Sequence, residues 1–112
     1  MDNRELIKLF YEEFFNNHDV TAAYKYVRAD YIQHNPGVAP GREGLINAFS
    51  EKFKAEQDFR LEIVKLIAEE DMIAVYLKNV DLEGCTKVRV VDIYRIMDGQ
   101  LAEHWDVLQP CT

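Results

Sequence analysis

The sequence has few of the features that mark membrane, secreted or nucleic-acid-binding proteins. No run of 18 apolar residues occurs, so we expect no membrane-spanning helix. Two acidic residues precede any apolar run at the start, which is typical of a mature chain rather than of a signal peptide. Acidic residues number 20 against 13 lysines and arginines, and a net charge of −7 argues against nucleic-acid or anionic-lipid partners. We therefore expect a cytoplasmic protein that binds neither nucleic acid nor membranes.

Cysteine is scarce as well. Cys85 and Cys111 are the two cysteines, and without a signal peptide we expect both to be reduced thiols. They form no CxxC or Cys/His pattern of a structural zinc site. His34, His104 and the aspartates show no HxH or HxxxH spacing, so the sequence predicts no metal site.

Internal repeats and low-complexity segments are absent too. The 112 residues, of which 48% are hydrophobic, suffice for one domain with one core. We therefore expect a single domain over residues 1–112.

The apolar pattern has a helical period in the first half of the chain and a strand period in the second. Helices are predicted over residues 4–15, about 21–28 and 45–57, with a short extended segment at 31–34. Four antiparallel strands are predicted to begin at residues 59, 72, 87 and 101, separated by turns at 69–71, 82–84 and 98–99. In the first strand one face is expected to hold Phe59, Leu61, Ile63 and Lys65. Helices followed by strands predict an α+β domain, in which a curled sheet closed by helices leaves a cone with an apolar interior.

The third long strand carries a carboxylate on a face that should be buried. Because strand residues alternate between faces, one mostly apolar face holds Val88, Val90, Asp92, Tyr94 and Ile96. A buried, unpaired carboxylate costs several kcal/mol or holds a proton. Asp92 therefore needs a partner or serves a chemical purpose.

The last strand repeats this anomaly. One face is predicted to hold Ala102, His104, Asp106 and Leu108, and the other Leu101, Glu103, Trp105 and Val107. Pairing through the hairpin at 98–99 would bring Asp92, His104 and Asp106 together, which is a ready acid/base arrangement. The alternative is a satisfied buried network, or an Asp106 that faces solvent at a strand end.

Further candidates lie outside these two strands. His34 and Asn35 precede Pro36, where a turn could aim them into the cone, although a histidine before a turn is more often a surface residue. Tyr11 belongs to the first helix, where a tyrosine at helical spacing is usually a core residue whose hydroxyl still needs a partner. Tyr94 and Trp105 complete the candidates for substrate binding.

Three stretches resemble the SnoaL-like polyketide cyclase branch of the NTF2-like superfamily. They are YIQHNP at 31–36, VDIYR at 91–95 and DGQLAEHWD at 98–106. The resemblance implies a cone-shaped α+β barrel closed by three N-terminal helices, and a homodimer formed through the open sheet face. It also implies ring closure by intramolecular aldol condensation without metal or cofactor, with a carboxylate on the last strand, Asp106, as acid/base.

Ketosteroid isomerase, which shares this fold, suggests further roles. Its oxyanion aspartate, which stays protonated, looks equivalent to Asp92, and its oxyanion tyrosine to Tyr11. Its base looks equivalent to Asn35, which cannot take a proton, so steroid isomerisation by that mechanism is not expected. The resemblance therefore shifts the base role to Asp106.

Together these observations predict enolate chemistry on a small hydrophobic carbonyl substrate in the cone. Asp106, tuned by His104, removes a proton, while a protonated Asp92 with Tyr11 or Asn35 stabilises the enolate oxygen. His34 is expected to orient the substrate or return the proton.

Two other functions remain open from the sequence, namely epoxide hydrolysis and a non-catalytic, dimeric ligand-binding module. The expected dimer interface on the outer sheet face holds Arg60, Glu62, Val64, Arg89, Val91 and Ile93.

Overall fold

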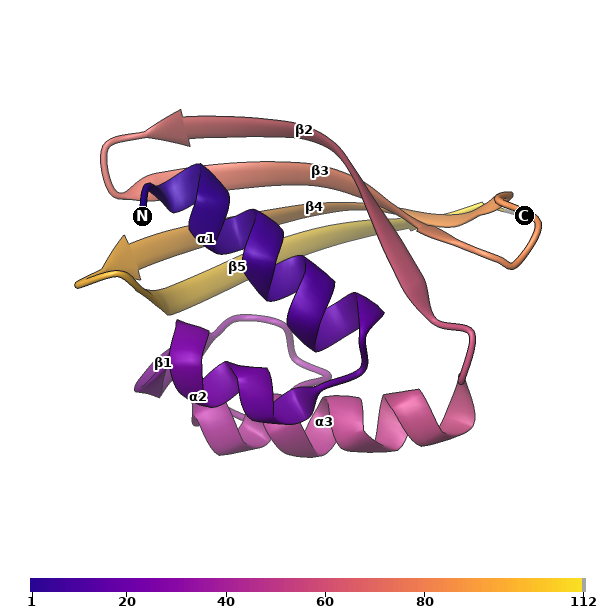
Figure 1. Cartoon of the computed structure of the whole chain (residues 1–112), viewed down its shortest axis with the longest axis horizontal. Helices are drawn as coiled ribbons and strands as arrows, with labels where there is room; N and C mark the ends of the chain where they lie inside the picture. Colours follow the sequence, from indigo (N-terminus) through magenta and orange to yellow (C-terminus); the bar gives the residue numbers. More distant parts are fainter. Residues whose placement is uncertain (112) are drawn as a thin grey trace.

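Helices form the first part of the chain and a five-stranded sheet forms most of the rest (Figure 1). The computed structural model describes residues 1–111. The helical elements are α1 (Asn3–Phe10), η1 (Tyr11–Asn16), η2 (Val20–Ala22), α2 (Ala23–Tyr26) and α3 (Gly41–Ala55). The strands are β1 (Val27–Gln33), β2 (Arg60–Glu69), β3 (Met72–Val80), β4 (Thr86–Met97) and β5 (Gln100–Pro110).

The first predicted helix is confirmed, but its geometry changes halfway along. Asp2 caps its start, because Oδ1 accepts a hydrogen bond from the backbone N–H of Glu5 at 2.8 Å. From Tyr11 onward the helix widens into the π-helical turn η1, which apolar spacing alone does not signal. The buried side chains of this continuous segment are Leu6, Ile7, Phe10, Tyr11, Phe14 and Phe15.

The second predicted helix ends earlier than expected. It stops at Tyr26, and β1 then runs from Val27 to Gln33, so the extended segment predicted at 31–34 is the end of a longer strand. The reason is tertiary, because β1 pairs in parallel with β5, with Val27 opposite Leu101 and Gln33 opposite His104. The third helix likewise begins four residues earlier than predicted, at Gly41.

The four long strands follow one another as antiparallel neighbours, as predicted, and the sheet order is β1-β5-β4-β3-β2. In Figure 1, α1 crosses the strands obliquely, while α2 and α3 lie beside β1. The aromatic core between helices and sheet includes Phe10, Phe14, Phe15, Phe53 and Phe59. The α+β cone closed by helices is therefore confirmed.

Two irregularities in strand register change which side chains face the core. The pairing of β2 with β3 shifts between Ile63 and Lys65, so Lys65 is exposed and Leu66 packs against the core instead. The prediction that Lys65 shares a face with Ile63 is thus wrong. Between β4 and β5 the register shifts next to Ala102, and both Leu101 and Ala102 are buried. The prediction that Leu101 shares a face with Glu103 is wrong for the same reason, an extra residue in one strand.

Cys85 and Cys111 are free cysteines, exposed and half-buried respectively. Over residues 1–111, none of the helices combines the length and the apolar character needed to cross a membrane.

Candidate active site

A cavity of about 210 Å³ opens between the helices and the inner face of the sheet. Most of its wall is apolar, from Phe15, Val38, Phe49, Phe59, Leu61, Leu77, Val88, Val90 and Leu108. Its polar lining residues are Gln33, Asn35, Lys52, Asn79, Asp92, Tyr94, His104 and Asp106. A mostly apolar wall with a few converging polar groups is the usual composition of a small-molecule site.

The β4–β5 hairpin places the central residues of the site. Asp98 and Gly99 form its turn with φ values of 52° and 74°, the backbone conformation that a tight two-residue hairpin turn requires. The register sets Asp92 opposite Asp106 and Tyr94 opposite His104. The sequence-based expectation that the hairpin would bring Asp92, His104 and Asp106 together is therefore confirmed.

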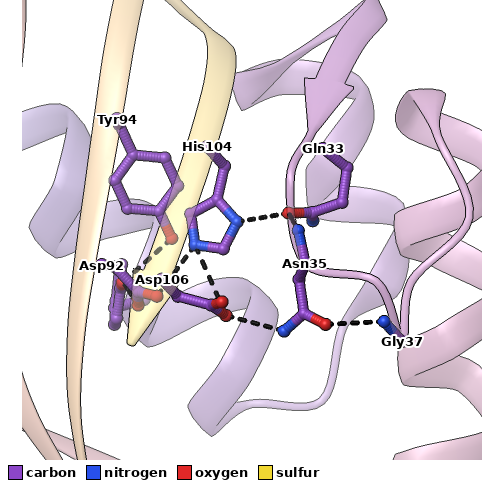
Figure 2. A network of polar contacts seen from close by, with 8 residues as sticks. Gln33, Asn35, Gly37, Asp92, Tyr94, His104 and Asp106 are labelled. Atoms are coloured by element: carbon purple, nitrogen blue, oxygen red, sulfur yellow. Dashed lines mark hydrogen bonds and ion pairs between the residues drawn. The ribbon is translucent and has the colours of Figure 1, made fainter. Parts of the chain in front are cut away.

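His104 is held between two partners (Figure 2). Its Nε2 lies 2.8 Å from Oδ1 of Asp92, and its Nδ1 lies 2.7 Å from Oε1 of Gln33. His104 and Asp92 are only 7% and 6% exposed, so water competes little for these hydrogen bonds. The imidazole is consequently fixed in position and orientation.

The contacts of Gln33 determine where one proton of His104 sits. The backbone N–H of Asn35 donates to Oε1 of Gln33 at 3.1 Å, which identifies this atom as the amide oxygen. An oxygen that only accepts requires Nδ1 of His104 to carry a proton. The 2.8 Å contact between Nε2 and Asp92 then holds one further proton, shared by the pair.

The second oxygen of Asp92 accepts a hydrogen bond from the hydroxyl of Tyr11. The Tyr11 hydroxyl also lies 2.9 Å from that of Tyr94. Burial, with the nearby Asp92 charge as the next cause, raises the pKa of both tyrosines well above the usual value. Both side chains therefore remain neutral hydrogen-bond donors over the physiological pH range.

Asp106 has a different environment from Asp92. Its Oδ2 accepts a hydrogen bond of 2.8 Å from Nδ2 of Asn35 and lies 4.0 Å from Nε2 of His104. Oδ1 of Asn35 accepts from the backbone N–H of Gly37 at 2.8 Å, which fixes the orientation of the Asn35 amide. The Asp106 carboxylate is thus held at the cavity wall, beside the imidazole but not bonded to it.

His34 and Trp105 lie outside this arrangement. Nε2 of His34 is 2.7 Å from Oε2 of Glu103, and its ring stacks on Trp105 with centroids 4.8 Å apart. Glu103 also accepts from Arg95 at 2.9 Å, and these two partners lower its pKa. Side chains alternate along a strand, so Gln33 and His104 face the cavity whereas His34 and Trp105 do not. The structure therefore does not bring the predicted His34 and Trp105 into the site.

Three polar residues of the cavity, Gln33, Lys52 and Asn79, are not among the residues predicted from the sequence. Gln33 lies two residues before the predicted Asn35, and alternation along an extended segment places the two on the same side. Asn79 is a single polar residue on the inner side of β3, between apolar neighbours.

Three side chains of the cavity have the spacing of metal ligands, but two of them already share a proton. Ligand atoms of Asp92, His104 and Asp106 all lie within 4.8 Å of one another, which is a spacing that a metal can bridge. Binding would have to displace the proton held between Nε2 and Asp92, because a metal ligand must be deprotonated. A second group, Asp81, Glu83 and Cys85, lies in the β3–β4 turn, where Oδ1 of Asp81 already accepts two backbone N–H groups.

A cone of curled sheet closed by helices, with a polar cluster inside, is the architecture of the NTF2-like proteins. One similar structure is an NTF2-like protein from Cytophaga hutchinsonii, with 21% identity and a TM-score of 0.77 over 98% of this chain and 92% of that one. The chain belongs to the SnoaL-like polyketide cyclase family, whose model matches residues 5–112.

Two Streptomyces proteins are also similar in structure. IdmH from Streptomyces antibioticus, a candidate polyketide cyclase, has 20% identity and a TM-score of 0.79 over 97% of this chain and 93% of that one. AclR from Streptomyces galilaeus, a candidate hydroxylase, has 23% identity and a TM-score of 0.74 over 95% and 88%. At these identities the likeness establishes the fold alone. No curated protein matches the chain.

Proposed function

We propose that this protein is a cofactor-independent enzyme that forms an enolate from a hydrophobic carbonyl compound and closes a ring by an intramolecular aldol addition. The observation that carries the proposal is the pairing of two unequal carboxylates in one apolar cavity. Asp106 stands at the wall with one amide donor, whereas Asp92 is hydrogen-bonded through both oxygens. Carboxylates in such different environments are suited to different roles in proton transfer.

Asp106 is the proposed general base. It takes the proton from the carbon next to the substrate carbonyl, and the C–H electron pair becomes the enolate. The enolate carbon attacks a second carbonyl of the same molecule, which forms the new C–C bond and moves that carbonyl's π pair onto its oxygen. Protonated Asp106 then gives its proton to this oxygen, which restores the carboxylate.

The Nε2–H group of His104, whose proton is shared with Asp92, is the proposed hydrogen-bond donor to the enolate oxygen. Nε2 of His104 lies 4.0 Å from Oδ2 of Asp106, so the donor and the base border the same small space. Tyr11 acts through Asp92, to which it donates, and Tyr94 supports Tyr11. Asn35 holds Asp106 in place rather than donating to the substrate. An oxyanion donor of this kind contributes about a hundredfold or more to the rate.

The apolar wall supports a hydrophobic substrate. Nine apolar residues line the cavity, and its volume of about 210 Å³ exceeds the roughly 150 Å³ cavity that holds benzene in a well-studied case. Exclusion of water by these side chains also strengthens every hydrogen bond to the reacting oxygen.

A homodimer through the outer sheet face is part of the proposal. Val64 and Val107 are 50% and 70% exposed on this side, and Val91 and Ile93 lie half-buried between them. Exposed apolar side chains that gather on one sheet face favour contact with another protein surface. Equilibrium ultracentrifugation of the wild type and of Val107→Glu tests this assignment, because the charged variant should be monomeric.

Proton exchange tests the reaction. The wild type should catalyse exchange of the methyl protons of 2-acetonaphthone in D₂O, followed by NMR, and Asp106→Asn should lose about a hundredfold or more of that rate. Glu103→Gln is the matched control, since Glu103 belongs to the same strand but bonds to His34 and Arg95 outside the cavity. Equal exchange by the wild type and Asp106→Asn would refute the assignment of the base.

A further inference from the structure

The cavity has a second polar end, away from Asp106. Asn79 on β3 lies opposite Val88 of β4, whereas Asp92 lies opposite Val75. Four residues along β3 separate the two levels, which corresponds to about 13 Å. The wall between them, which includes Leu77 and Val90, is apolar.

Asn79 is a buried amide with an unused oxygen. The residue is 8% exposed and lines the cavity, and within residues 1–111 its Oδ1 is buried without a hydrogen-bond partner. Buried polar atoms without partners are rare in folded proteins. A half-turn about the Cβ–Cγ bond exchanges the oxygen and nitrogen of the amide, so Oδ1 can be turned to the cavity to accept a hydrogen bond from a bound molecule.

The charge at this end indicates which kind of group would bind. Lys52 also lines the cavity, but its Nζ is paired with Oε2 of Glu56 at 2.7 Å, a carboxylate whose Oε1 also lies 3.6 Å from Nζ of Lys87. The lysine that lines the cavity therefore already has a carboxylate partner, and a carboxylate on the ligand would have to compete with Glu56 for it. A neutral hydrogen-bond donor, such as a hydroxyl group, matches the unused oxygen of Asn79.

We propose that Asn79 is a recognition site for a hydroxyl group on the substrate. The ligand is then a two-ended molecule of about two fused rings, with an enolisable carbonyl at the Asp106 end and a phenolic or enolic hydroxyl at the Asn79 end. The direction in which the ligand lies rests on the proposed function, whereas the hydrogen bond to Asn79 does not.

Three matched ketones test this inference by isothermal titration calorimetry. They are 6-hydroxy-2-acetonaphthone, its 6-methoxy ether, which cannot donate a hydrogen bond, and unsubstituted 2-acetonaphthone. The wild type should bind the hydroxy compound about 5- to 10-fold more tightly than either of the others. Asn79→Leu should abolish this preference, and Leu77→Met, which alters the same wall without changing its polarity, should retain it.

Thermal unfolding tests whether a lost preference in Asn79→Leu comes from lost recognition of the hydroxyl group or from a less stable fold. Asn79→Leu should melt no lower than the wild type, because it replaces an unpaired buried amide with an apolar side chain of similar size. A wild type without preference for the hydroxy compound, or an Asn79→Leu variant that keeps the preference, would overturn the inference.

The same ketones separate this inference from the proposed reaction. Preference for the hydroxy compound without any proton exchange would refute the enolate chemistry and leave Asn79 as the recognition site. Exchange that depends on Asp106, together with equal binding of the hydroxy compound and the other two ketones, would refute the role of Asn79 and leave the proposed chemistry intact.

Discussion

Nδ1 of His104 lies 2.7 Å from Oε1 of Gln33, an oxygen that also accepts the backbone N–H of Asn35. This pair of contacts fixes the proton on Nδ1 and leaves Nε2 to share a proton with Asp92. Gln33 is therefore a positioning residue, which acts on the substrate only through His104.

Substitution of Gln33 should change the pH dependence of exchange as well as its rate. Gln33→Leu leaves the buried Nδ1–H without an acceptor, and we expect a roughly tenfold lower rate. Gln33→Glu keeps an acceptor for the Nδ1 proton and adds a negative charge beside the imidazole, so the pH–rate profile of this variant should differ from that of the wild type. A merely structural role would lower the rate of both variants without moving the profile.

Asn35 should control the charge of Asp106. Asn35→Asp places a second carboxylate where an amide now donates at 2.8 Å, and two carboxylates at that distance share one proton. We expect slower exchange than in the wild type, because the shared proton occupies the oxygen with which Asp106 would accept the substrate proton. The measurement is the exchange rate of 2-acetonaphthone against pH, with Asn35→Ser as the uncharged comparison. An unchanged profile in Asn35→Asp would mean that Asp106 is not the base.

Much of the site was predictable because strand parity and a short hairpin are local properties of the sequence. Asp92, His104 and Asp106 all follow from alternation on two strands joined by Asp98-Gly99. The parallel pairing of β1 with β5 has no local signal in the sequence, and this pairing turns Gln33 rather than His34 toward the cavity. The place of Asn79 in the cavity cannot be predicted from the sequence, because a single polar residue in a buried strand gives the same sequence pattern beside a cavity as in a packed core.

Three of the buried tyrosines, Tyr11, Tyr31 and Tyr94, should make the fold sensitive to alkali. Burial raises the pKa of Tyr11, Tyr31 and Tyr94 well above the usual value of about 10. A group that binds its proton more tightly when folded contributes stability in full below its unfolded pKa and loses that contribution as the pH rises toward the folded value. The free energy of unfolding should therefore fall above about pH 10.

Tyrosinate absorbance and circular dichroism, followed together during alkaline titration, check this expectation. The last tyrosines should ionise in step with loss of secondary structure, and Tyr31→Phe should reduce the loss of stability above pH 10 relative to the wild type. Ionisation of all six tyrosines while the fold remains intact would contradict the expectation.

His34 should be dispensable for chemistry although it lies next to the site in sequence. Its ring stacks on Trp105 and its Nε2 meets Glu103, outside the cavity. His34→Ala should therefore leave the exchange rate within about twofold of the wild type and reduce stability by less than about 1 kcal/mol, as is usual for a partly exposed ion pair. Because His34 is the first cause of the lowered pKa of Glu103, the variant should lose less stability than the wild type as the pH falls through the range where Glu103 titrates. A hundredfold loss of exchange in a folded His34→Ala variant would instead require this histidine to turn into the cavity during the reaction.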